Sequence, residues 1–120
     1  MLVSIDPNNP GELTISQQAY DKKIVGVISG ANGVQAGMLL AQKGTLADGD
    51  TPVAITGRVY CYADASNEPI EAGDFLTTAP IAGFAMKATD MDKARGAIIG
   101  KAMTGLEEGQ GMVLILITLQ

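Results

Sequence analysis

The chain ends in a nearly unbroken apolar run, from Met112 to Leu119, that contains no charged residue. This run is far too short to span a bilayer. Its β-branched residues and the Gly109-Gln110-Gly111 segment before it indicate a β-strand, and the continuous hydrophobicity indicates that both faces of the strand are covered. A small single-sheet protein can cover only one face itself. We therefore expect another copy of this chain to cover the second face.

The composition agrees with a domain that hides surface by self-association. The chain has 120 residues, 18% of them charged and 47% apolar, which is a low charge content for one exposed domain. Its net charge is −5, and Lys22-Lys23 is the only adjacent basic pair, so a nucleic-acid partner is not expected. Neither a signal peptide nor a membrane-spanning segment is predicted. The single domain is either a free-standing oligomer or the C-terminal piece of a longer chain.

Short apolar runs separated by turn residues, together with 15 glycines, predict an all-β fold. We expect a compact barrel or sandwich of short hairpins, with at most one or two helical turns. The helical candidates are Thr89–Arg95, with Thr89 as its N-cap, and more weakly Ser16–Tyr20. The predicted strands are Leu2–Ile5, Glu12–Ile15, Ile24–Ser29, Met38–Gln42, Pro52–Ala63, Asp74–Thr78, Phe84–Ala88, Ala97–Met103 and Met112–Leu119.

The faces of two of these strands can be assigned, because successive strand residues point to opposite sides of a sheet. In the longest, the odd positions are small or apolar and are expected in the core, with a bulge at Gly57. Its even positions Arg58, Tyr60 and Tyr62 are expected at a subunit interface or, in a second interpretation, at a glycan or small-ligand site. In the last strand we assign one row to the core, namely Val113, Ile115, Ile117 and Leu119. The other row is assigned to a neighbouring subunit, namely Met112, Leu114, Leu116 and Thr118.

A glycine pattern recurs with a spacing of 36 residues. Gly37, Gly73 and Gly109 each end an apolar-x-x-Gly motif before a predicted strand, and an earlier strand in each unit contains Gly26, Gly57 or Gly100. We interpret this pattern as three related β-hairpin units whose turn glycine adopts a positive φ angle. Chance reuse of the same turn is the alternative.

The residues that usually perform catalysis are scarce. The chain has no histidine, which removes the commonest general base and most transition-metal sites. Cys61 lies at an inward position of its strand and is predicted to be a buried structural thiol. Asp48-Gly49-Asp50 and Asp90-Met91-Asp92 are read as turn and cap carboxylates rather than Ca²⁺ ligands. We predict a non-catalytic protein without cofactor or metal; a Ser29–Lys101 dyad is the remaining catalytic alternative.

Several segments resemble a widespread, largely uncharacterised β-domain at the C-terminal end of bacterial and phage proteins, often after fibrous regions, which is similar to trimeric tail-fibre and appendage tips. The matching segments are Pro52–Val59, Pro69–Thr78, Gly83–Ala88 and Ile99–Ala102. The resemblance implies a homotrimer that caps a fibre of a virion-like particle or cell-surface appendage. A glycan-binding tip is an alternative. A self-processing chaperone is another, although no catalytic serine of such proteins can be matched here.

Overall fold

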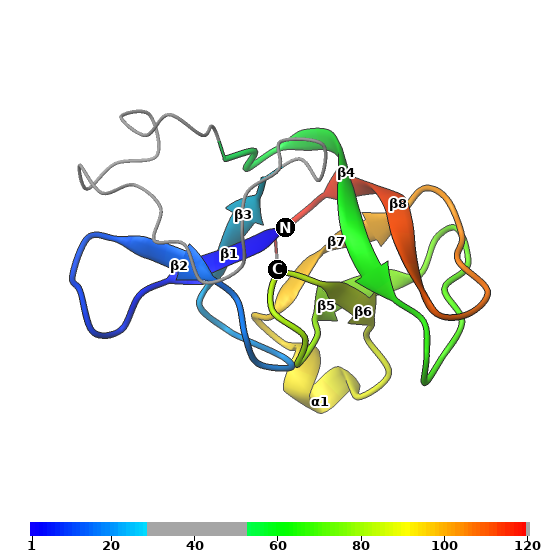
Figure 1. Ribbon diagram of the computed structural model, residues 1–120, viewed down its shortest axis with the longest axis horizontal. Helices are drawn as coiled ribbons and strands as arrows, with labels where there is room; N and C mark the ends of the chain where they lie inside the picture. Colours follow the sequence, from blue (N-terminus) through cyan, green and yellow to red (C-terminus); the bar gives the residue numbers. More distant parts are fainter. Residues whose placement is uncertain (29–52, 120) are drawn as a thin grey trace.

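The computed structural model describes residues 1–28 and 53–119, which form two sheets and almost no helix (Figure 1). The all-β prediction is confirmed. Seven of the predicted strands recur with ends shifted by at most two residues, because alternating and β-branched runs bounded by turns specify strands locally. The predicted strand Met38–Gln42 lies outside the described residues. The elements are β1 Leu2–Ile5, β2 Leu13–Ile15, β3 Ile24–Val27, β4 Gly57–Asp64, β5 Phe75–Thr78, β6 Ala85–Lys87, α1 Met91–Ala94, β7 Ile98–Ala102 and β8 Gln110–Ile117.

The first sheet is three-stranded, in the order β2-β1-β3, with both outer strands antiparallel to β1. The link from β2 to β3 must therefore run back along the whole length of β1. Its ends are held at opposite ends of that strand: the Ser16 amide donates to the Leu2 carbonyl, and the Ile5 amide donates to the Lys23 carbonyl, each at 2.9 Å. This crossing link covers β1 with polar residues rather than with a helix.

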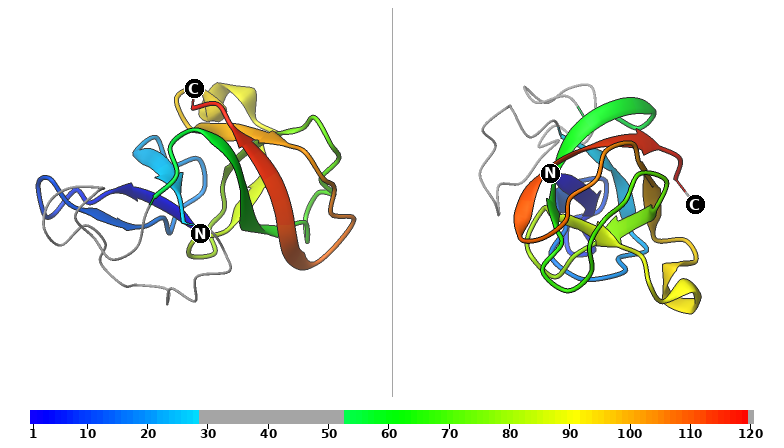
Figure 2. Two further views of the ribbon diagram at one scale, coloured as in Figure 1. Left: turned by 90° about the horizontal axis from the view of Figure 1, so that it is seen from above. Right: turned by 90° about the vertical axis from the view of Figure 1, so that its right-hand side faces the viewer.

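The second sheet has five strands whose hydrogen-bonded order, β4-β6-β5-β7-β8, closes on itself because β8 pairs with β4 (Figure 2). The β4–β8 pairing is antiparallel and runs from Gly57 opposite Ile117 to Asp64 opposite Gln110. The closure between β4 and β6 is a short parallel contact, Ala63 opposite Ala85. The β4–β8 pair is therefore the longest continuous ladder that the structure describes.

Adjacent residues of β1 point to opposite faces and pack into two different apolar clusters. Leu2 packs with the interior of the closed sheet, including Leu76, Ile99 and Ile115, whereas Val3 packs with Ile15 on the other side. Leu2 and Val3 are both fully buried. Strand parity thus lets one short strand contribute to both cores.

The predicted long strand from Pro52 to Ala63 is wrong in its first half. Gly57 has a φ of +85°, and the regular strand β4 begins there. Before it, Ala54 forms an isolated bridge with Val27, and Ile55, predicted to face the core, is 51% exposed. The glycine acts as a corner at the beginning of β4 rather than as a bulge within a strand, because a positive φ turns the chain out of the extended direction.

The helix predictions also need correction. The helix is α1, one turn long, and its N-cap is Asp90 rather than Thr89, because the Asp90 carboxylate accepts from the Asp92 and Lys93 amides. The Thr89 and Asp90 amides instead donate to the Tyr20 hydroxyl, at 3.1 and 3.0 Å. The predicted Ser16–Tyr20 helix is absent, and Tyr20 has a φ of +54°.

The glycine pattern has two structural meanings. Gly73 and Gly109 have positive φ angles before β5 and β8, as predicted. The hairpin interpretation is right for β7 and β8, which pair, and wrong for β4 and β5, which are separated by β6. Gly100 is needed for another reason: a Cβ atom there would lie 2.0 Å from the Leu116 carbonyl oxygen. Gly37 lies outside the described residues.

Candidate functional site

The six residues predicted at an interface lie together on the outer face of the β4–β8 pair. Register places them directly opposite one another in three pairs: Arg58 with Leu116, Tyr60 with Leu114 and Tyr62 with Met112. They share this face because they occupy even positions on two antiparallel strands whose even residues are in register. We call these six residues the β4–β8 outer face.

Large side chains on the β4–β8 outer face are accessible to solvent. Tyr60 is 52% exposed, and Met112 and Leu116 are each 39% exposed, while Leu114 and Tyr62 are half-buried. Side chains one residue away along either strand point inward. Cys61 and its partner Val113 are buried, as is Ile115, whereas Val59 opposite Ile115 is half-buried. The same two strands therefore separate a buried apolar row from an exposed apolar row.

The core row of the last strand is assigned correctly in part. Val113, Ile115 and Ile117 are buried, but Leu119 is 43% exposed. Leu119 lies two residues beyond the end of β8, where no paired strand fixes its direction. In the other row, the Thr118 side chain is half-buried and its hydroxyl has no hydrogen-bond partner.

Opposite charges flank the apolar residues of this face. Arg58 and Lys101 lie on either side of Leu116, since β4 and β7 both pair with β8 at that position. The Lys101 ammonium lies 5.2 Å from the centre of the Phe75 ring, a cation–π contact. At the other end of the ladder, the loop before β8 exposes Glu107 and Glu108. The β4–β8 ladder thus has basic residues beside one end and acidic residues in the loop that precedes the other.

Tyr62 is oriented by a neighbouring ring. Its ring centre lies 5.4 Å from that of Phe84, and the two rings are inclined by 26°. This stacking occupies one side of Tyr62, so of the two tyrosines Tyr60 offers more open surface. Phe84 was not predicted at this face, and Lys101 was considered only as a member of the alternative dyad. The alternation within Ile98–Ala102 could have predicted that Lys101 points outward. The position of Phe84 beside Tyr62 could not be predicted in this way, because it depends on the pairing of distant strands.

Cys61 has the environment of a structural thiol. It is fully buried and donates a hydrogen bond to the Tyr62 carbonyl, at 3.3 Å. Burial raises the pKa of the Cys61 thiol, which disfavours the thiolate needed for nucleophilic attack. Ser29, the serine of the alternative dyad, lies outside the described residues.

Carboxylates in the described segments are used to shape turns. Asp90 caps α1, and Asp6 accepts hydrogen bonds from Asn8 and Asn9. Within residues 1–28 and 53–119, no group of three or more His, Cys, Asp or Glu side chains is arranged to hold a metal ion. The Asp48-Gly49-Asp50 segment lies outside those ranges.

No family model matches this sequence, and no curated protein or solved structure shows a significant match to it. Among the described residues there is also no helix long and apolar enough to cross a membrane.

Proposed function

We propose that this protein is a structural, non-catalytic module that assembles with copies of itself through the β4–β8 outer face. The observation that supports this most strongly is the juxtaposition of Tyr60, Tyr62, Met112, Leu114 and Leu116 on one solvent-facing ladder. A contiguous apolar patch of this kind on a small domain is typical of an interaction surface. Its aromatic and methionine side chains and its arginine are the types enriched at interfaces.

A second copy fits this face by charge as well as by apolarity. Arg58 and Lys101 gather at one end, and Glu107 and Glu108 lie near the other. If neighbours pack head to tail, the basic end of one subunit meets the acidic end of the next. Head-to-tail contacts form a ring when the rotation between neighbours closes, and we propose a trimer as that ring. The resemblance to tail-fibre and appendage tips supports the same subunit number and a capping role at a fibre end.

The use of Arg58, Tyr60 and Tyr62 as a glycan-binding surface is the less supported alternative. Sugar stacking needs an open aromatic ring, and one side of Tyr62 is already stacked on Phe84. A glycan array on the wild-type protein and on Tyr60→Ala separates the two functions, because only glycan binding at this face loses its signal when the Tyr60 ring is removed.

The proposal is tested by the molar mass in solution, measured by light scattering after size exclusion. We expect three times the 12.4 kDa chain mass. Leu116→Lys places a charge in the contact and should weaken assembly at least about 100-fold, since the loss recurs at every subunit contact. Leu119→Lys is the matched control, because Leu119 is exposed to a similar degree, 43% against 39%, but lies outside the face.

A wild-type monomer at micromolar concentration would contradict the proposal. Equal loss of assembly in Leu116→Lys and Leu119→Lys would show that this face is not the specific contact. Circular dichroism of both variants checks that each subunit remains folded, which is expected because both side chains point to solvent.

A further inference from the structure

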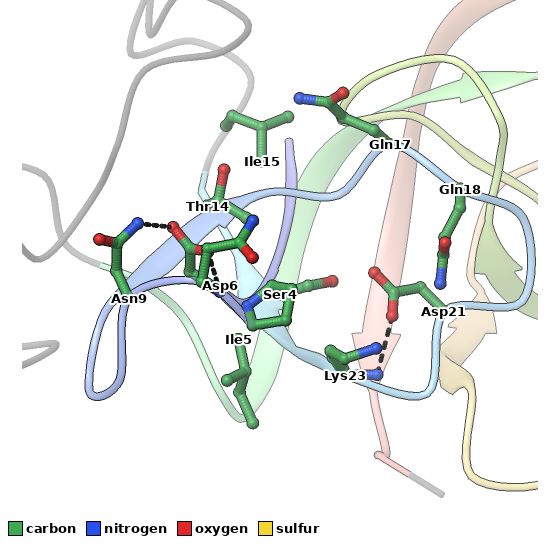
Figure 3. Close-up of a pocket in the computed structure, with 12 residues that line it drawn as sticks. Ser4, Ile5, Asp6, Asn9, Thr14, Ile15, Gln17, Gln18, Asp21 and Lys23 are labelled. Carbon is green, nitrogen blue, oxygen red and sulfur yellow. Dashed lines mark hydrogen bonds between the residues drawn. The ribbon is translucent and has the colours of Figure 1, made fainter.

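The face of the first sheet that carries Ser4 forms the floor of a polar groove, which shares no lining residue with the β4–β8 outer face. The groove has a volume of about 370 Å³ and lies between the Asp6–Asn9 turn on one side and the β2–β3 link on the other (Figure 3). It exists because the link, which crosses β1, lies over the strand face that bears Ser4. Figure 3 shows Ser4 between Asp6, on the turn side, and Asp21, on the link side.

Ser4 has an unsatisfied hydrogen-bonding group in this groove. Its side chain is 98% buried at 2% exposure, it lines the groove, and its hydroxyl has no hydrogen-bond partner. Buried polar groups are nearly always paired, so an unpaired hydroxyl in a groove lining indicates a site for a bound group. In the part of the chain that the structure describes, the one other buried side-chain oxygen or nitrogen without a partner is Thr118 Oγ1, which does not line this groove.

The two carboxylates beside Ser4 are held in fixed positions. Asp6 accepts from the Asn8 amide and from Asn9 Nδ2, both at 2.9 Å. Asp21 accepts from the Lys23 amide at 2.9 Å and from the Ser16 hydroxyl at 3.3 Å. An ionised carboxylate has about four acceptor positions, so each retains capacity for a ligand. The internal hydrogen bonds orient both groups before any ligand arrives, which lowers the ordering cost of binding.

The chemistry of the lining selects the class of ligand. Asp6 and Asp21 only accept hydrogen bonds, Lys23 only donates them, and the amides of Gln17 and Gln18 do both. Two carboxylates disfavour an anion, and the lysine disfavours a simple cation. A hydroxyl group both donates and accepts, so closely spaced hydroxyls match this mixed lining. A groove of about 370 Å³ is at the small end of ligand sites, which suits one sugar unit.

We infer that this groove binds a small polyhydroxylated ligand, a single sugar unit or polyol, with Ser4, Asp6 and Asp21 as its central contacts. The site is on the three-stranded sheet and does not depend on the proposed assembly face. It goes beyond the proposed function, since a capping module with such a groove would also bind a saccharide.

The test is a titration of the wild-type protein with glucose, galactose, N-acetylglucosamine and glycerol, followed by backbone amide NMR shifts. We expect saturable shifts confined to the groove. Ser4→Ala should weaken binding about tenfold, because one ligand hydrogen bond is lost. Its folded state should be retained, because the mutation removes a buried unpaired hydroxyl. Thr118→Val is the matched control: it removes the other unpaired hydroxyl and should leave binding unchanged.

Methyl glycosides distinguish a free sugar from the terminal unit of a glycan as the natural ligand. Equal binding of a sugar and its methyl glycoside indicates the terminal unit of a glycan, and loss with the glycoside indicates a free sugar; both outcomes support the polyol site. Absence of saturable shifts with all four probes overturns the inference. So does equal binding by wild type and Ser4→Ala, which would assign Ser4 a structural role only. Because the readout is local, neither result depends on whether the wild type is oligomeric.

Discussion

On the three-stranded sheet, Ser4 and Asp6 are polar and buried, whereas on the closed sheet Tyr60 and Leu116 are apolar and exposed. The cause of the difference is what covers each face. The link from β2 to β3 crosses β1 and carries polar residues, including Ser16 and Asp21, which hydrogen-bond to each other. No described segment crosses the outer face of β4 and β8 in this way. The buried polar face is thus covered by another segment of the same chain. We interpret the exposed apolar face as a contact surface for a second molecule.

The largest expected effect distinguishes the two faces of β8. Ile115 is fully buried and Leu116 is 39% exposed, although they are adjacent. Ile115→Asp buries a charge without a partner and should prevent folding, at a cost of more than about 4 kcal/mol. Leu116→Asp should leave strand content intact while breaking the assembly. Circular dichroism and light scattering on both variants check this.

The outcome that contradicts this assignment is a reversal. If Ile115→Asp gives folded monomers and Leu116→Asp retains the full oligomer, the β4–β8 outer face is not the contact. If both variants assemble like the wild type, the last strand is not at an interface.

A smaller effect is expected when the polar face of the three-stranded sheet is disturbed. Asp21 is 5% exposed and accepts from the Lys23 amide and the Ser16 hydroxyl. Asp21→Ala leaves these donors without their acceptor and should lower the free energy of unfolding by about 1–3 kcal/mol. Asp21→Asn, which retains one carbonyl acceptor, should cost less. Urea unfolding of the three proteins measures the difference, and equal stability of all three would show that water replaces these hydrogen bonds without cost.

The smallest effect concerns pH. The hydrogen bond from the Asn9 side chain, followed by that from the Asn8 amide, lowers the pKa of Asp6 below its usual 3.8. The folded state therefore favours the ionised carboxylate. This contribution is fully present above the unfolded pKa and is lost as the pH falls through the lowered folded pKa.

The matched variant for the pH effect is Asp6→Asn, which cannot titrate. Unfolding free energies between pH 6 and pH 2 should fall more steeply for wild type than for the variant, with the difference confined to the acidic end. Parallel curves would show that Asp6 has the same pKa in both states. Arg58→Gln on the closed sheet removes no carboxylate and should therefore retain the acid dependence of the wild type.

Local sequence patterns determined the strands, the turns and the parity of their side chains. Alternation placed Cys61 and Ile115 inward because successive strand residues point to opposite faces, whatever the partner strand is. The same rule grouped the six residues of the β4–β8 outer face into two correct rows. Gly73 and Gly109 were predicted as turn glycines because their conformation is set by neighbouring residues.

The tertiary structure alone decided what depends on distant contacts. The register of β4 against β8 places Tyr60 beside Leu114, and no local pattern specifies that pairing. The positive φ of Gly57 ended a strand that alternation alone would have continued. The groove around Ser4 arises because the β2–β3 link folds back along β1, bringing Asp21 beside a strand that is far from it in the sequence. The periodicity of the sequence determines to which side of a sheet a side chain points. The order and register of the strands determine which residues it contacts, because paired strands can be distant in the sequence.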